Sequence, residues 1–138
     1  MKVEKIMFAK DDSLTKVVEL LRELENKANL YVAFLVTVEG LRIATSSDTR
    51  IEADELSALA ASLLNASMMA VEQLNQGDLE EVSIRGSHGF SIVRRIDEDK
   101  LLIAAGFEPE KIGLTLHLMA KYVEMFLKIF NEPLEELR

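Results

Sequence analysis

The 138-residue chain contains no cysteine and no tryptophan, and it has only two histidines. The lack of cysteine excludes a disulfide framework, a thiolate nucleophile, and zinc or iron–sulfur sites with cysteine ligands. The two histidines, His88 and His117, are far apart in the sequence and form no familiar zinc-binding motif. The sequence also lacks a phosphate-binding loop and a nucleophile elbow. We therefore expect a protein that is not an enzyme and that binds no metal and no cofactor.

Positive charge is scarce as well. Lysine and arginine total 16 against 24 aspartates and glutamates, which gives a formal net charge of -8 at pH 7. Nucleic-acid-binding proteins concentrate lysine and arginine on one face. Here the only adjacent basic pair is Arg94 and Arg95, and neighbouring residues of a strand point to opposite faces. We expect no nucleic-acid partner.

Long apolar segments are also missing. The longest uncharged run has 16 residues, four of them serine or asparagine, and is too short and too polar for a membrane span. Charges scattered through the first twelve residues differ from the unbroken apolar stretch of a signal peptide. We expect a cytoplasmic protein without membrane insertion.

What remains indicates one α+β domain. Residues 11–29 carry apolar residues at three- and four-residue spacing, which predicts an amphipathic helix. Residues 30–38 form a nearly unbroken apolar and β-branched run, which predicts a strand covered on both faces. The turn Glu39-Gly40 and the half-polar segment 41–46 complete a predicted hairpin.

The second half of the chain predicts three short antiparallel strands and a last helix. The strands are expected at 79–85, 89–96 and 100–107, because turn residues separate these segments. Pro109 suits the first turn of the last helix, and Pro133 ends it. With a helix between the two groups of strands, the predicted order is helix, two strands, helix, three strands, helix.

The middle helix contains the uncharged run, Leu56–Val71, in a chain that is 29% charged. Helical spacing predicts that one stripe faces the core, formed by Leu56, Leu59, Ala60, Leu63, Ser67, Ala70, Val71 and Leu74. The opposite side is also uncharged up to Glu72, and consists of Ser57, Ala58, Ala61, Ser62, Leu64, Asn65, Met68 and Met69. A helix that is apolar on both sides predicts a second partner. The alternative is a helix in the middle of a larger core.

The first strand of the meander is a candidate sheet edge, because it follows a helix and has one neighbour in the hairpin. Its sequence is nearly self-complementary about Ser83. Antiparallel pairing with a second copy would set Val82 against Ile84 and Glu81 against Arg85. These five residues are the predicted dimer edge. The alternative is a charge-protected edge that pairs with nothing.

Several segments, in this order, resemble the roadblock/dynein light-chain family. They are VEGLRIATSS, the uncharged helix, GDLEEVSIRG, LLIAAGF and KIGLTLHLMAKYVEMFLKIF. The resemblance covers residues 14–130, nearly the whole chain. Bacterial and archaeal members of this family include activators and scaffolds of Ras-like GTPases.

The resemblance implies a five-stranded antiparallel sheet with the middle helix on one face and the first and last helices on the other. This is a profilin- and roadblock-like arrangement in the order α-β-β-α-β-β-β-α. It also implies a dimer whose sheet continues across the third strands, with the middle helices side by side as a platform for a Ras-like GTPase. Together with the residue pattern, it gives a predicted dimer or partner face formed by Ala58, Ala61, Leu64, Asn65, Met68, Met69 and Glu72.

We therefore predict a cytoplasmic homodimer that regulates or scaffolds a small Ras-like GTPase. The predicted domain spans residues 14–131, between an N-terminal extension, 1–13, and a tail, 132–138. Two alternatives stay open. One is an assembly module that makes no GTPase contact, and the other is a small-molecule sensor of profilin- or GAF-like type, which would need a cavity with convergent polar groups. Strands filled with leucine, isoleucine and valine favour a solid core over such a cavity.

Overall fold

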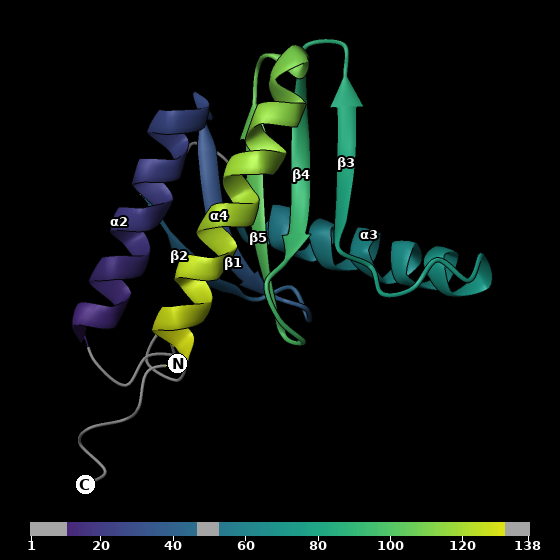
Figure 1. Ribbon diagram of the computed structural model, residues 1–138, viewed down its shortest axis with the longest axis horizontal. Helices are drawn as coiled ribbons and strands as arrows, with labels where there is room; N and C mark the ends of the chain where they lie inside the picture. The colour runs from purple at the N-terminus through teal and green to yellow at the C-terminus, as the bar shows by residue number, and fades with distance from the viewer. Residues whose placement is uncertain (1–10, 47–52, 132–138) are drawn as a thin grey trace, which may run out of the picture.

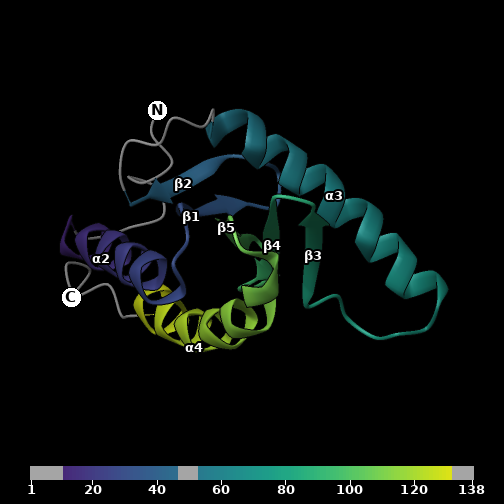
Figure 2. The same cartoon turned by 90° about the horizontal axis from the view of Figure 1, so that it is seen from above.

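The computed structural model describes residues 11–46 and 53–131. It contains a five-stranded antiparallel sheet in the order β2-β1-β5-β4-β3, with α3 on one face and α2 and α4 on the other (Figures 1 and 2). This confirms the predicted fold class. The elements are α2 (Asp11–Ala28), β1 (Val32–Thr37), β2 (Arg42–Thr45), α3 (Ala53–Gln73), β3 (Glu81–Gly86), β4 (Gly89–Arg95), β5 (Lys100–Gly106), a 3-10 turn (Pro109–Lys111) and α4 (Ile112–Phe130).

The two central strands are buried on both faces, which explains their unbroken apolar sequences. Every residue of β1 and β5 is buried. Because side chains alternate across a strand, Ala33 and Leu35 pack under α2 and α4, whereas Val32, Phe34 and Val36 pack under α3. Each face of the sheet therefore has its own apolar core.

The core under α2 and α4 is the larger one. Both helices have a conventional amphipathic pattern, so the buried side of each matches the sheet and the other side is charged. The hydrophobic side chains that the two helices bury in this core are Val17, Leu21, Leu24, Ala28, Met119, Tyr122, Val123 and Phe126.

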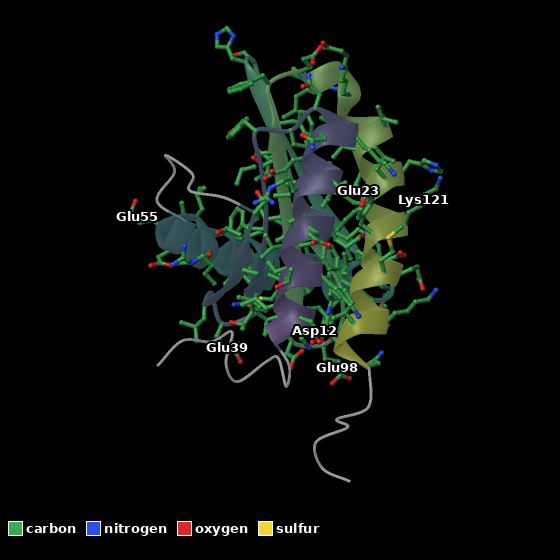
Figure 3. The ribbon with its side chains drawn as sticks, turned by 90° about the vertical axis from the view of Figure 1, so that its left-hand side faces the viewer. Asp12, Glu23, Glu39, Glu55, Glu98 and Lys121 are labelled. Carbon is green, nitrogen blue, oxygen red and sulfur yellow. The ribbon has the colours of Figure 1, made fainter. Side chains whose placement is uncertain are left out.

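Polar contacts also join α2 to α4. The Tyr122 hydroxyl donates a 2.7 Å hydrogen bond to Glu23, and the ammonium of Lys27 lies 3.1 Å from the same carboxylate. Figure 3 shows Glu23 between the two helices and Lys121 pointing away from them. Burial, and then the Glu23 carboxylate, raise the pKa of Tyr122. The hydrogen bond from Tyr122, and then Lys27, lower the pKa of Glu23.

Lys100 contacts both the end of α4 and the turn between β4 and β5. Its ammonium lies 3.0 Å from Asp97 and 3.0 Å from Asp99, and 4.8 Å from the centre of the Phe130 ring. Burial alone would lower the pKa of Lys100, but the hydrogen bonds with Asp99 and Asp97 outweigh it and raise the pKa. A charged Lys100 is therefore part of the folded structure.

Candidate interaction surface on helix α3 and strand β3

The buried side of α3 differs from the sequence prediction by roughly a quarter of a turn, at 100° per residue. Ala61 and Leu64, which were predicted to face a partner, are buried, and Leu64 is only 1% exposed. Leu59 and Leu74, which were predicted to face the core, are 66% and 64% exposed. Between Asp54 and Gln73, the buried α3 side chains are Ser57, Ala60, Ala61 and Leu64.

Met68 is also placed differently from the prediction. It is partly buried and packs against the core under α3. Its Sδ lies 3.9 Å from Nη1 of Arg95, which belongs to β4. A substitution at Met68 would therefore disturb contacts within the chain as well as any partner contact.

Four of the predicted partner-face residues are exposed, namely Ala58, Asn65, Met69 and Glu72. The outward surface of α3 also includes exposed residues that the sequence prediction did not select, because its stripe was rotated. This surface, which we call the outer α3 face, is uncharged between Glu55 and Glu72 and comprises Ala58, Leu59, Ser62, Asn65, Ala66, Met69 and Ala70. Apart from the close approach of Gly40 to Ala58, no residue in the described part of the chain covers it.

Part of the small-residue pattern has an explanation within the chain. The turn between β1 and β2 approaches α3 closely at Gly40, whose φ of +96° strongly favours glycine. A Cβ atom on Gly40 would lie 3.2 Å from Cα of Ala58 and 3.4 Å from the carbonyl oxygen of Ser57. Small residues at this point of α3 therefore let the turn pack against the helix.

Helix α3 extends beyond the edge of the sheet that β3 forms. It crosses the strands at the end of the sheet where β3 begins, and its C-terminal part projects past β3 (Figures 1 and 2). Met69 and Leu74, near this end, are 65% and 64% exposed. The projecting part thus presents apolar side chains beyond the chain's own sheet.

Strand β3 is at the edge of the sheet, as the sequence predicted. Among the described strands, only β4 pairs with it. The amide of Arg95 donates to the carbonyl of Glu80 at 3.0 Å, so the alternation of antiparallel pairing directs the backbone groups of Glu81, Ser83 and Arg85 outward. An edge with free backbone donors and acceptors is a template for another strand.

The side chains at this edge have partners within the chain. Glu81 accepts a hydrogen bond from Arg94, and Arg85 donates to the carbonyl of Pro109 at 3.1 Å. Arg94 and Arg95 do lie on opposite faces, since Arg94 contacts Glu81 and Arg95 contacts Met68. The two basic residues therefore form no joint patch.

The sheet face under α3 is left partly open at the end farthest from the helix. Ile84 and Phe107 are exposed there, and the Phe107 ring stacks on Tyr31 with 4.4 Å between the ring centres. An apolar group of this kind on a small protein is typical of an interaction site.

Other kinds of site have little support in the described residues. Within residues 11–46 and 53–131, no group of three histidine, aspartate or glutamate side chains is arranged to hold a metal ion. None of the helices that the structure describes is both long and apolar enough to cross a membrane.

The sequence and the fold of this chain are similar to those of known proteins. A sequence model of the Roadblock/LC7 domain matches residues 16–105. No curated protein sequence matches the chain. Among solved structures, MglB of Myxococcus xanthus is similar, with a TM-score of 0.78 and 21% identity, covering 84% of this chain and 95% of MglB.

Two further solved structures have the same fold. The gliding protein MglB of Thermus thermophilus has a TM-score of 0.82 and 19% identity, covering 92% of this chain and 97% of that protein. A Roadblock/LC7 domain of Streptomyces avermitilis has a TM-score of 0.64 and 19% identity, covering 79% of this chain and 95% of the domain.

Proposed function

The chain belongs to the Roadblock/LC7 domain family, and from this membership we propose that it is a non-enzymatic, cytoplasmic homodimer that regulates or scaffolds a small Ras-like GTPase. The observation that carries the proposal is the outer α3 face, which is uncharged and has no cover within the described chain. We propose a domain of residues 14–131, with 1–13 and 132–138 as flanking segments; the family match lies within it.

The homodimer forms through β3. Antiparallel pairing about Ser83 uses the outward backbone groups of Glu81, Ser83 and Arg85 in both copies. It also brings Glu81 of each copy next to Arg85 of the other. A two-fold axis through Ser83 and perpendicular to the sheet joins the sheets and keeps both α3 helices on the same face.

The same axis accounts for the exposed apolar residues. The projecting end of α3 would lie over the open part of the second copy's sheet, because the two-fold axis reverses the ends of the strands. Leu74 of one copy would approach Ile84 and Phe107 of the other. One contact, repeated twice, would cover three side chains that are exposed in a single chain.

The outer α3 faces of the two copies then form one platform. A Ras-like GTPase that binds it in one conformation of its switch regions would be held in that conformation, since a partner shifts an equilibrium by its difference in affinity for the two states. The platform supplies binding surface and no reacting group.

Two measurements test the proposal. Sedimentation of the full chain at micromolar concentration should give twice the chain mass of 15.5 kDa. Titration with a Ras-like GTPase from the same genome, in its GDP form and bound to a non-hydrolysable GTP analogue, should show nucleotide-dependent binding. A monomer would contradict the dimer, and a dimer that binds neither form of any such GTPase would leave an assembly module as the function.

A further inference from the structure

A hollow of about 400 Å³ lies at the corner where α3 leads into β3. Met68, Val71 and Leu79 give it an apolar lining. Its other lining residues are polar or small, namely Glu72, Asn75, Gly77, Asp78 and Arg95. The hollow therefore combines an apolar surface with polar groups at its rim.

The free charges of this hollow are negative. Neither Glu72 nor Asp78 has an ion pair with a described residue, and both are exposed. Arg95 is the only cation in the lining, and its guanidinium donates to the carbonyls of Asp97 at 3.2 Å and Glu98 at 3.4 Å. A fitting occupant is consequently cationic or rich in hydrogen-bond donors.

Charge is separated along this part of the sequence. Residues 51–81 contain seven acidic residues and no lysine, arginine or histidine. Residues 82–96, which form most of the β3–β4 hairpin, contain Arg85, His88, Arg94 and Arg95 and no acidic residue. The acidic segment supplies every lining residue of the hollow except Arg95, and the basic segment forms the hairpin beside it.

The register about Ser83 brings these two segments together across the dimer. Counting outward from Ser83, Gly86, the last residue of β3, lies opposite Glu80 of the other copy, and the turn residues Ser87 and His88 follow beside the segment that leads from α3 into the other copy's β3. The tip of each hairpin therefore reaches the corner at which the other copy has its hollow.

We propose that this hollow is a socket for the hairpin tip of a second copy, residues 86–89, with His88 of that copy donating to Asp78 of the hollow. The inference rests on the proposed homodimer and adds a binding site to it. By symmetry the dimer contains two such sockets, so each change at His88 acts twice.

The test is the dimer dissociation constant of the full chain, measured by sedimentation. Replacing His88 with Glu should raise it about tenfold or more, because a like charge meets Asp78 at two symmetric places. His88→Lys should leave it within about threefold of the wild type. The double variant His88→Glu with Asp78→Lys should recover most of the loss. His117→Glu is the matched control, since His117 is exposed on α4, and should have no effect.

The outcomes separate the socket from the dimer itself. If His88→Glu leaves the dissociation constant unchanged while Arg85→Glu raises it, the dimer stands and the socket is wrong. If His117→Glu weakens the dimer as much as His88→Glu, the effect is one of net charge and the socket is also wrong. A wild-type chain that sediments as a monomer contradicts the proposed dimer, and the socket with it.

Discussion

The two faces of the sheet differ in how completely one chain covers them. On one face, α2 and α4 bury a large core, and polar contacts such as Tyr122 with Glu23 join the helices to each other. On the other face, α3 covers one end of the sheet and projects past its edge, leaving Ile84 and Phe107 exposed. The described residues cover the first face, whereas they leave apolar surface on the second face exposed.

The outer surfaces of the helices differ in the same way. The outward sides of α2 and α4 are charged, as expected for helices with one side facing the solvent. The outward side of α3 is uncharged over more than four turns. Of the described helices α2, α3 and α4, only α3 has such an uncharged face, and this is why we propose that side of the molecule for binding.

The largest expected effect separates buried from exposed leucines of α3. Leu64→Ala should lower the free energy of unfolding by about 2–5 kcal/mol, because it leaves a cavity in the core. Leu59→Ala, at an exposed position, should change it by less than about 0.5 kcal/mol. Urea unfolding at one fixed protein concentration measures both. An equal decrease in the free energy of unfolding for both variants would mean that Leu59 is also buried, as the sequence predicted.

A second substitution probes the closed face. Lys100→Met should lower the free energy of unfolding by about 1–3 kcal/mol, because it leaves Asp97 and Asp99 close together without their cation. Lys111→Met removes a more exposed ion pair with Glu108 and should cost less than about 1 kcal/mol. Thermal unfolding of the two variants, side by side, checks the difference.

The edge strand should respond to the sign of its charges. Arg85→Glu places like charges together at two symmetric positions and should weaken the dimer by about 1 kcal/mol. The double reversal Glu81→Arg with Arg85→Glu should restore part of the loss. Restoration is expected to be incomplete because Glu81 also binds Arg94 of its own chain. An unchanged dissociation constant for Arg85→Glu would show that the register is wrong.

The smallest expected effect is a pH dependence at the α2–α4 contact. The pKa of Glu23 is below its ordinary value of 4.5, so its ionised form contributes stability above that pH, and the contribution is lost as the pH falls through the folded-state pKa. Stability should therefore decline below about pH 4.5, and Glu23→Gln should reduce the slope there. Urea unfolding between pH 3 and 6 provides the comparison; identical slopes would exclude a contribution from Glu23.

Much of the fold follows from local patterns in the sequence. The run 30–38 predicted a doubly covered strand, and β1 is buried along its whole length. The turn residues between strands predicted the antiparallel order, including the edge position of β3. These features depend on neighbours in the sequence, which periodicity and turn chemistry describe well.

The orientation of α3 could not be predicted in the same way. Leucine, alanine, serine and methionine occur on every side of this helix, so the apolar pattern only weakly favours one direction. The observed orientation includes the close approach of Gly40 to Ala58 and the contact of Arg95 with Met68, and both join segments that are distant in the sequence. The same limit applies to the hollow beside Asp78, which lies where α3, the segment that follows it and β4 meet.

The binding of a Ras-like GTPase to two methionine variants tests the central claim most directly. Met69→Glu puts a charge on the outer α3 face, whereas Met125→Glu puts the same charge on the exposed side of α4. At concentrations where both variants sediment as dimers, the account predicts that Met69→Glu weakens GTPase binding by about 2 kcal/mol or more and that Met125→Glu leaves it unchanged. Equal affinities for the two variants would contradict the assignment of the outer α3 face as the docking surface.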